Sequence, residues 1–232
     1  MKKALFDLSL VPLKVVNRVF DLHVGGPRRD VFFDIDRTFP SLRRIDDGYP
    51  VIREEMLAVL PDKDSIPRYH DLDAGQTEIS ATTDHDWKVF LLYAMGEKPE
   101  ANRSRCPRTC EILDEIPDLF QAFFSILDGG KNVPAHCGPY RGYLRYHLGL
   151  QVPENNPPKI RVADQEHTWR EGESVLFDDS WDHEVINQAD DIRVVLIVDV
   201  LRPMPQPHDG INRVVTRGIQ QFYARGLAKK LR

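Results

Sequence analysis

The segment YLRYHLGL, residues 143–150, alternates its side chains in a way that decides how the chain folds around it. In an extended strand alternate residues share a face, so Arg145 and His147 lie together on one side. The other side carries Leu144, Tyr146, Leu148 and Leu150. That second face is an ordinary core face, whereas the first holds a guanidinium and an imidazole. If the strand is part of a barrel, the polar face predicts a bound ligand, and an anion is the simplest match.

Short strand-like segments separated by turns surround this stretch from residue 119 onward. The predicted strands span residues 119–127, 143–150, 158–163, 174–177, 183–187 and 192–200. Turn residues lie between them, for example the pair Gly129-Gly130 and the run of Asn and Pro at 155–158. Many short strands with such turns are typical of a β-sandwich or a jelly-roll barrel. We therefore expect a mainly β fold with flanking helices.

Helical patterns precede, interrupt and follow this region. Apolar residues recur at helical spacing in residues 4–24, 51–60 and 107–115, and the tail 211–232 has the pattern of a basic helix. The apolar run 87–94 fits either a buried strand or a helix. The expected organisation is an N-terminal helix and linker (1–30), a β domain with helical additions (31–203), and a C-terminal tail or helix (204–232).

The composition excludes several classes of protein. The 232 residues include 31 Lys and Arg against 36 Asp and Glu, a formal charge of −5, so the basic surplus of a nucleic-acid binder is missing. Three cysteines, Cys106, Cys110 and Cys137, do not make a disulfide framework. No secretory signal and no apolar stretch of ~20 residues is visible, so no transmembrane segment is predicted. We expect a cytoplasmic protein, with residues 4–24 either packed on their own domain or in peripheral contact with the inner face of a membrane.

Two histidines near predicted strands are candidate metal ligands. His136 lies in PAHCGPYRG, where Pro and Gly predict a loop at the rim of a barrel, and His183 opens a strand in FDDSWDHEV. They are far apart in the sequence, which therefore does not prove that they meet. Two imidazoles in one small barrel suit Fe, Zn, Cu or Ni, whereas a single His is more often a packed or surface residue.

Arg193 and the aspartates before His183 each have two interpretations. Arg193 opens an apolar strand, either as a rim residue bonded to a turn or as a guanidinium that binds a carboxylate inside the barrel. Asp178, Asp179 and Asp182 are better placed to cap turns than to bind metal. Asp182 directly precedes His183, so in a strand the two side chains face opposite ways.

Three stretches together resemble a known family. HCGPYRGYLRYHLGL (136–150), FDDSWDHEVIN (177–187) and RVVLIVDVLRP (193–203) are similar to the aspartyl/asparaginyl β-hydroxylases, and the resemblance covers residues 119–203. It implies a double-stranded β-helix, which is a jelly-roll or cupin-like form. It also implies a dioxygenase that uses Fe(2+), O2 and the small-molecule cosubstrate 2-oxoglutarate to hydroxylate an unactivated C–H bond.

The resemblance implies two classes of substrate. The segments WKVF (87–90) and CPRT (106–109) look like the bacterial branch of the family, which includes acyl-chain hydroxylases of lipid A and ornithine lipids. The substrate is then either a peptide or amino-acid side chain or a lipid acyl chain. Two competing classes of function remain: a jelly-roll module that binds an anion without turnover, and a zinc hydrolase, for which two histidines are too few ligands.

The resemblance also implies a role for each candidate residue. His136 and His183 match the catalytic, metal-binding histidines of the family. The cosubstrate-binding residues match Ser125 and Arg193 at the distal carboxylate of 2-oxoglutarate, and Arg145 and His147 near its metal-chelating end.

Position 138 carries the acid of the metal-binding triad in many related oxygenases, and here it is glycine. In the resemblance, glycine at this position is typical of the aspartyl/asparaginyl β-hydroxylases, and an acid is typical of the lipid A hydroxylases. The motif LRYHLGL (144–150) instead resembles the lipid-hydroxylase branch. We expect two protein ligands, with Asp179 or Asp182 as the alternative third.

Overall fold

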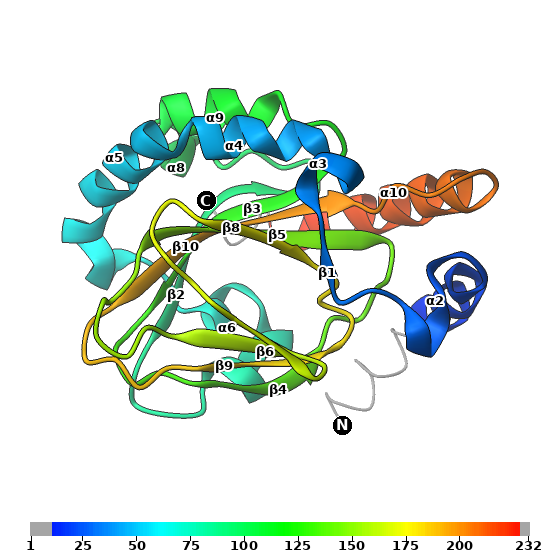
Figure 1. The fold of residues 1–232 in the computed structure, drawn as a ribbon. Coiled ribbons are helices and arrows are strands. Elements are labelled where there is room, and N and C mark those ends of the chain that lie inside the picture. Colours follow the sequence, from blue (N-terminus) through cyan, green and yellow to red (C-terminus); the bar gives the residue numbers. More distant parts are fainter. Residues whose placement is uncertain (1–10, 228–232) are drawn as a thin grey trace.

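The fold consists of two antiparallel β-sheets that pack face to face (Figure 1). The computed structural model describes residues 11–227, apart from the side chains of residues 11, 12, 74 and 222–227. The larger sheet contains, in spatial order, β1 (Phe32–Phe33), β8 (Ser174–Phe177), β5 (Tyr143–Gln151), β10 (Arg193–Leu201), β3 (Leu119–Leu127) and β2 (Trp87–Ala94). The smaller sheet contains β4 (Val133–Cys137), β9 (Asp182–Ile186), β6 (Lys159–Val162) and β7 (Gln165–Thr168). This arrangement confirms the predicted jelly-roll core.

Helices cover the outer face of the larger sheet, which lies uppermost in Figure 1. They are α4 (Arg43–Asp47), α5 (Tyr49–Val59) and α9 (Pro107–Asp114), with the short α3 (Ile35–Thr38) and α8 (Glu100–Arg103) beside them. Two more short helices, α6 (Tyr69–Leu72) and α7 (Thr77–Ser80), precede β2. One apolar core fills the space between these outer helices and the sheet, and a second core fills the space between the sheets.

The alternation predicted for residues 143–150 is confirmed by strand β5. Leu144, Tyr146, Leu148 and Leu150 belong to the core under the helices. His147 lies on the opposite face, where its ring meets Phe177 of the core between the sheets at a centroid distance of 5.0 Å. The polar face of this strand therefore points into the interior of the jelly roll.

Most predicted strands are observed within two residues of their predicted bounds. Residues 119–127 and 174–177 have the predicted limits, and the run 87–94, left open between helix and strand, is strand β2. The prediction of a loop around His136 is wrong, because residues 133–137 form β4. Pro134 is compatible with this strand because β4 is at the edge of its sheet, so the missing N–H costs no ladder bond. Strand β7 was also missed, since its sequence QEHT has no apolar alternation.

Helices α2 (Val11–Val24) and α10 (His208–Leu227) lie side by side at one end of the molecule (Figure 1). Phe20 of α2 is fully buried, and its ring lies 5.8 Å from Tyr140 and 6.5 Å from His208. The predicted helices 4–24 and 211–232 are thus present, although residues 4–10 and 228–232 lie outside the described part. Within the described residues, no helix is long and apolar enough to cross a membrane.

Candidate active site

The two candidate histidines are direct neighbours on adjacent strands. His136 of β4 is the register partner of His183 of β9, and their ring centroids are 4.1 Å apart. Directly opposite residues of an antiparallel pair project to the same face, which explains why the two rings meet. His183 is only 4% exposed, whereas His136 is partly accessible from the adjoining cavity. The structure therefore brings together two residues that the sequence could not connect.

Both rings are held in the form that binds metal. The Nδ1 atom of His136 lies 2.8 Å from the carbonyl oxygen of Pro134, and Nδ1 of His183 lies 2.9 Å from that of Trp181. A carbonyl oxygen only accepts, so each Nδ1 carries the proton and each Nε2 keeps a lone pair. Burial lowers the pKa of His136, and it lowers the pKa of His183 to about 3. Both imidazoles are therefore neutral at pH 7, and the pair fits a divalent first-row metal ion.

Asp179 takes up the space beside Gly138. A Cβ atom at Gly138 would lie 2.5 Å from Oδ1 of Asp179, so position 138 has no room for an acid. Asp179 accepts from the hydroxyl of Tyr143 at 2.8 Å and pairs with Arg145 at 3.2 Å, and burial raises its pKa to about 7. Asp182 is exposed and pairs with Arg161 at 2.8 Å.

No third side chain joins the histidines in the described part of the chain. There, no group of three or more His, Cys, Asp or Glu residues is arranged to hold a metal ion. The expectation of two protein ligands stays a prediction.

Arg193 is a buried cation without a counter-ion. It is 2% exposed, and no carboxylate among the described residues pairs with it. One guanidinium nitrogen lies 3.3 Å from Oγ of Ser125, and the group lies 4.3 Å above the ring of Trp169, while Nε has no hydrogen-bond partner. Burial lowers the pKa of Arg193 to about 9, so it is still charged at pH 7. An isolated buried charge is costly, and a bound carboxylate would compensate it.

Further unpartnered polar groups surround this guanidinium. Both ring nitrogens of His147 are buried without a partner, as are Nε1 of Trp169 and Nε2 of His167. The ring of His147 stacks on Trp169 at 5.7 Å, and burial keeps its pKa well below the usual range. Native proteins rarely leave so many buried polar atoms unsatisfied. The cluster fits a small ligand with several oxygen acceptors, which is the chemistry of 2-oxoglutarate.

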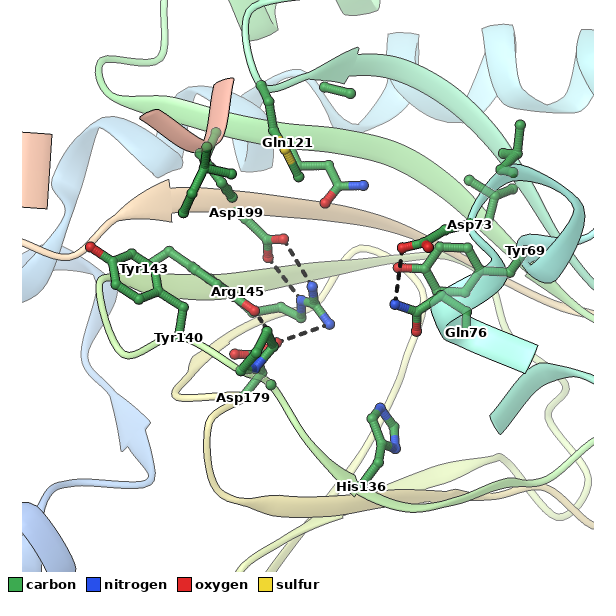
Figure 2. Close-up of a pocket in the computed structure, with 18 of the residues that line it drawn as sticks. Tyr69, Asp73, Gln76, Gln121, His136, Tyr140, Tyr143, Arg145, Asp179 and Asp199 are labelled. Carbon is green, nitrogen blue, oxygen red and sulfur yellow. Dashed lines mark hydrogen bonds and ion pairs between the residues drawn. The ribbon is translucent and has the colours of Figure 1, made fainter. Parts of the chain in front are cut away.

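A largely apolar cavity of about 520 Å³ opens beside His136 (Figure 2). Its polar end contains His136, Arg145, Asp179 and Asp199, and Tyr69, Asp73 and Gln76 lie across it. The remaining wall comes from β2, β3 and the two terminal helices and includes Leu91, Phe120, Leu13, Val215 and Ile219. The cavity can therefore accommodate an apolar group next to the histidine pair.

Sequence comparison places the chain in a family. Residues 46–203 match the aspartyl/asparaginyl β-hydroxylase family. The chain belongs to this family. It is 44% identical over 176 residues to the ornithine lipid ester-linked acyl 2-hydroxylase of Rhizobium tropici, a match that covers 75% of this chain and 62% of that protein. It is 33% identical over 171 residues to the human aspartyl/asparaginyl β-hydroxylase, covering 72% of this chain and 22% of that protein.

The chain thus spans less than two thirds of the length of these curated relatives. Among solved structures, a prolyl-4-hydroxylase from Pseudomonas putida aligns with a TM-score of 0.42 and 14% identity, covering 67% of this chain and 88% of that one. No functional conclusion is drawn from this distant structural similarity. The resemblance proposed from residues 119–203 is confirmed, and the family match extends it towards the N-terminus to residue 46.

Arg145 and His147 share a strand face in this β-hydroxylase family member but lie in different surroundings. The guanidinium of Arg145 is held by both carboxylate oxygens of Asp199, at 2.8 and 2.9 Å, and by Asp179 (Figure 2). It faces the apolar cavity, whereas His147 lies beside Arg193 and Trp169. The role predicted for both, near one end of the cosubstrate, stays a prediction. Because Arg145 is already engaged by two carboxylates, it is the weaker candidate of the two for binding the cosubstrate.

Sequence reasoning missed three residues of the site. Trp87 donates from Nε1 to Ser125 at 2.9 Å, and Trp169 and His167 line the Arg193 side of the interior. Trp169 lies just after the unpredicted strand β7, and Trp87 lay in a run whose state was open. The sequence did show tryptophans near polar residues. Only the pairing of the strands shows that these indole rings lie between the two sheets, beside the polar residues of the site.

Proposed function

We propose that this chain is an Fe(2+)- and 2-oxoglutarate-dependent dioxygenase that hydroxylates an unactivated C–H bond. One observation carries the proposal: two neutral histidines, each protonated at Nδ1 with a lone pair at Nε2, share the interior of the jelly roll with a buried arginine that pairs with no described carboxylate. Family membership supports hydroxylation in general. The buried arginine adds the reason to expect an anionic cosubstrate.

Each residue of the site has a defined task in this proposal. His136 and His183 would hold the iron, and Arg193 with Ser125 would bind a carboxylate of 2-oxoglutarate. Iron and 2-oxoglutarate together supply O2 activation, which inserts hydroxyl into the substrate and yields succinate and CO2. The Nδ1–H groups stay bonded to backbone carbonyls and keep the imidazoles oriented. The apolar cavity wall excludes water from the C–H bond beside His136.

A lipid acyl chain is the substrate class that the cavity favours. Its wall is mostly apolar, and Arg145, the one arginine among the described residues that line it, is already compensated by two carboxylates. An acidic substrate side chain would find no spare cation there. The relative from Rhizobium tropici, named an acyl 2-hydroxylase, supports the same choice. An aspartyl or asparaginyl side chain is the alternative, supported by the family description.

The test is iron- and oxygen-dependent decarboxylation of 2-oxoglutarate, measured as succinate, with a panel of acyl lipids and Asp- or Asn-containing peptides. We expect acyl lipids to stimulate turnover and to appear as hydroxylated products. Stimulation by peptides alone would support the alternative substrate. Tight 2-oxoglutarate binding without succinate under any condition would identify a binding module instead of an enzyme.

A bulky residue inside the cavity should block the substrate without affecting the cosubstrate. Ile219 of α10 lines the cavity, whereas Val214 on the same helix is 68% exposed. We expect Ile219→Trp to lower succinate formation stimulated by a water-soluble, short-chain acyl substrate by about tenfold, which corresponds to ~1.4 kcal/mol of lost binding. The KM for 2-oxoglutarate should not change. The matched control Val214→Trp should behave like the wild type, and equal losses in both variants would contradict the cavity assignment.

We also propose that α2 makes peripheral contact with the inner face of a membrane. Val15 and Leu22, seven residues apart on one helix face, are 57% and 84% exposed, and the exposed Lys14 and Arg18 lie on the same helix. Apolar side chains flanked by basic ones are typical of surface-binding helices. Leu13 of this helix lines the cavity, so contact would bring acyl chains to its mouth.

Vesicle binding tests this contact. We expect the protein to co-sediment with vesicles containing anionic phospholipid, and the double variant Val15→Asp, Leu22→Asp to bind at least about tenfold more weakly, since burial of one such side chain contributes ~1.5–3 kcal/mol. Leu57→Asp on α5 is the matched control, because Leu57 is also exposed, at 38%, but lies on the outer helical layer. Equal binding of all three proteins would show that α2 is not the contact.

A further inference from the structure

Arg29 connects the N-terminal segment to the site. It precedes the family-matched residues 46–203, yet it is only 6% exposed. Its Nε donates to Asp178 at 2.9 Å, one terminal nitrogen donates to the carbonyl of Gly26 at 2.9 Å, and the other donates to Ser180 at 3.2 Å. The linker expected within residues 1–30 is thus anchored in the interior by Arg29.

Two partners of Arg29, Asp178 and Ser180, belong to the turn 178–181 between β8 and β9. Asp178 is fully buried, and its Oδ1 accepts from the backbone N–H of Ser180 at 2.9 Å and from its hydroxyl at 2.6 Å. Its Oδ2 binds Arg29 and also Arg202 at 2.6 Å. The predicted role of Asp178 as a turn cap is therefore observed, and two arginines from outside the turn hold the cap in place.

The same turn contacts both histidine-bearing strands. The carbonyl of Trp181 accepts the Nδ1–H of His183 at 2.9 Å, and the carbonyl of Asp179 accepts from the N–H of Gly138 at 2.8 Å, two residues after His136. The guanidinium of Arg29 lies 3.7 Å above the ring of Trp181. The indole N–H of Trp181 reaches the carbonyl of Asp30 at 3.3 Å. Residues 29 and 30 therefore hold the peptide that orients His183.

We infer that Arg29 is a positioning residue of the metal site, which acts through the turn 178–181 on the orientation of His183. The inference rests on the proposed function, because it assigns His183 to iron. With two protein ligands, each imidazole supplies one of the two bonds from the protein to the metal. A change in the direction of one Nε2 atom therefore has a large effect on metal affinity. Groups that hydrogen-bond to metal-binding histidines typically change metal affinity 10- to 100-fold when they are removed.

Metal affinity of the intact protein tests the inference without requiring turnover. Anaerobic titration of the metal-free protein with Fe(2+), and with Mn(2+) as a redox-stable probe, gives the Kd. We expect Arg29→Gln to raise both Kd values by up to about tenfold, the lower end of the range for a group bonded directly to a ligand, because Arg29 reaches His183 only through the turn. Arg29→Lys keeps the charge but loses the planar contacts with Ser180 and Trp181, so its Kd should lie between those of the wild type and Arg29→Gln. Nitrogen NMR of the metal-free protein should show that His183 no longer holds the Nδ1–H tautomer in Arg29→Gln.

Ile52→Val is the control for general destabilisation. Ile52 of α5 is fully buried in the core between the outer helices and the larger sheet, and losing one methyl group there lowers the stability of the fold. It should leave the metal Kd unchanged. An unchanged Kd in folded Arg29→Gln, or an equal increase in Ile52→Val, would overturn the inference while leaving the proposed function intact. If Arg29→Gln does not fold, Arg29→Lys decides by the same comparison. A wild-type protein that binds neither metal would overturn the proposed function and the inference with it.

Discussion

Alanine at either His136 or His183 is expected to abolish stoichiometric iron binding and 2-oxoglutarate turnover. The two rings are cross-strand partners with centroids 4.1 Å apart, and the described residues offer no third ligand beside them. Each variant leaves one imidazole for the metal. We expect affinity for Fe(2+) to fall by more than about a hundredfold, beyond the 10- to 100-fold cost of losing only a group that orients a ligand. Anaerobic titration with Fe(2+) and a succinate assay measure the two effects.

A histidine far from the pair provides the control for this prediction. His23 is exposed on α2, where its ring lies 5.7 Å from His208. His23→Ala should retain wild-type iron binding and turnover. If His136→Ala or His183→Ala keeps full iron and full activity, the metal assignment is wrong, whichever carboxylate then proves to be the ligand.

A strand is easiest to predict from the sequence when its two faces lie in different environments, because its apolar and polar residues then alternate. Strand β5 separates the helix-covered core from the interior, so its apolar and polar faces are distinct in the sequence. Strands β4 and β7 lie at the two edges of the smaller sheet, and most of their residues are exposed. Edge strands need less apolar alternation, which is why the loop predicted around His136 proved to be a strand.

The candidate site was predictable as a set of residue types but not as a set of contacts. His136 and His183 were identifiable, whereas their meeting depends on the register of β4 against β9. The compensation of Arg145 was not predictable, because Asp199 comes from a neighbouring strand and Asp179 from a distant turn. For the same reason the sequence around Gly138 did not show that Asp179, 41 positions later, lies beside it in the fold.

Arg29 shows most clearly which contacts cannot be predicted from the sequence. In the sequence GGPRRDV it is one of two adjacent arginines in an expected linker, with no periodic pattern around it. Its neighbour Arg28 is exposed, and only the fold distinguishes the two. Long-range contacts of a single charged residue leave no local signal in a sequence, so no interpretation of residues 25–31 alone separates a linker from part of the site.

Methionine at Arg193 is expected to remove 2-oxoglutarate binding without destabilising the metal-free protein. A charged hydrogen bond contributes ~1.5–3 kcal/mol, so the Kd for 2-oxoglutarate should rise by about 10- to 150-fold. The stability effect has the opposite sign from that of most buried substitutions. Arg193 pairs with no carboxylate of residues 11–227, so its replacement by an apolar side chain removes an uncompensated buried charge. The melting temperature without ligand should stay unchanged or rise, while the increase caused by 2-oxoglutarate disappears.

Arg145→Met is the contrasting variant, because it removes a guanidinium that two carboxylates already compensate. Asp179 and Asp199 would be left buried and unpaired, and breaking such a pair costs about 3–5 kcal/mol. Arg145→Met should therefore melt well below the wild type, yet a folded fraction at low temperature should still bind 2-oxoglutarate. Thermal unfolding of both variants with and without 2-oxoglutarate separates the two arginines. If Arg193→Met keeps its response to 2-oxoglutarate and Arg145→Met loses it, the carboxylate-binding role passes to Arg145, and the ion pairs with Asp179 and Asp199 must then open to admit the ligand.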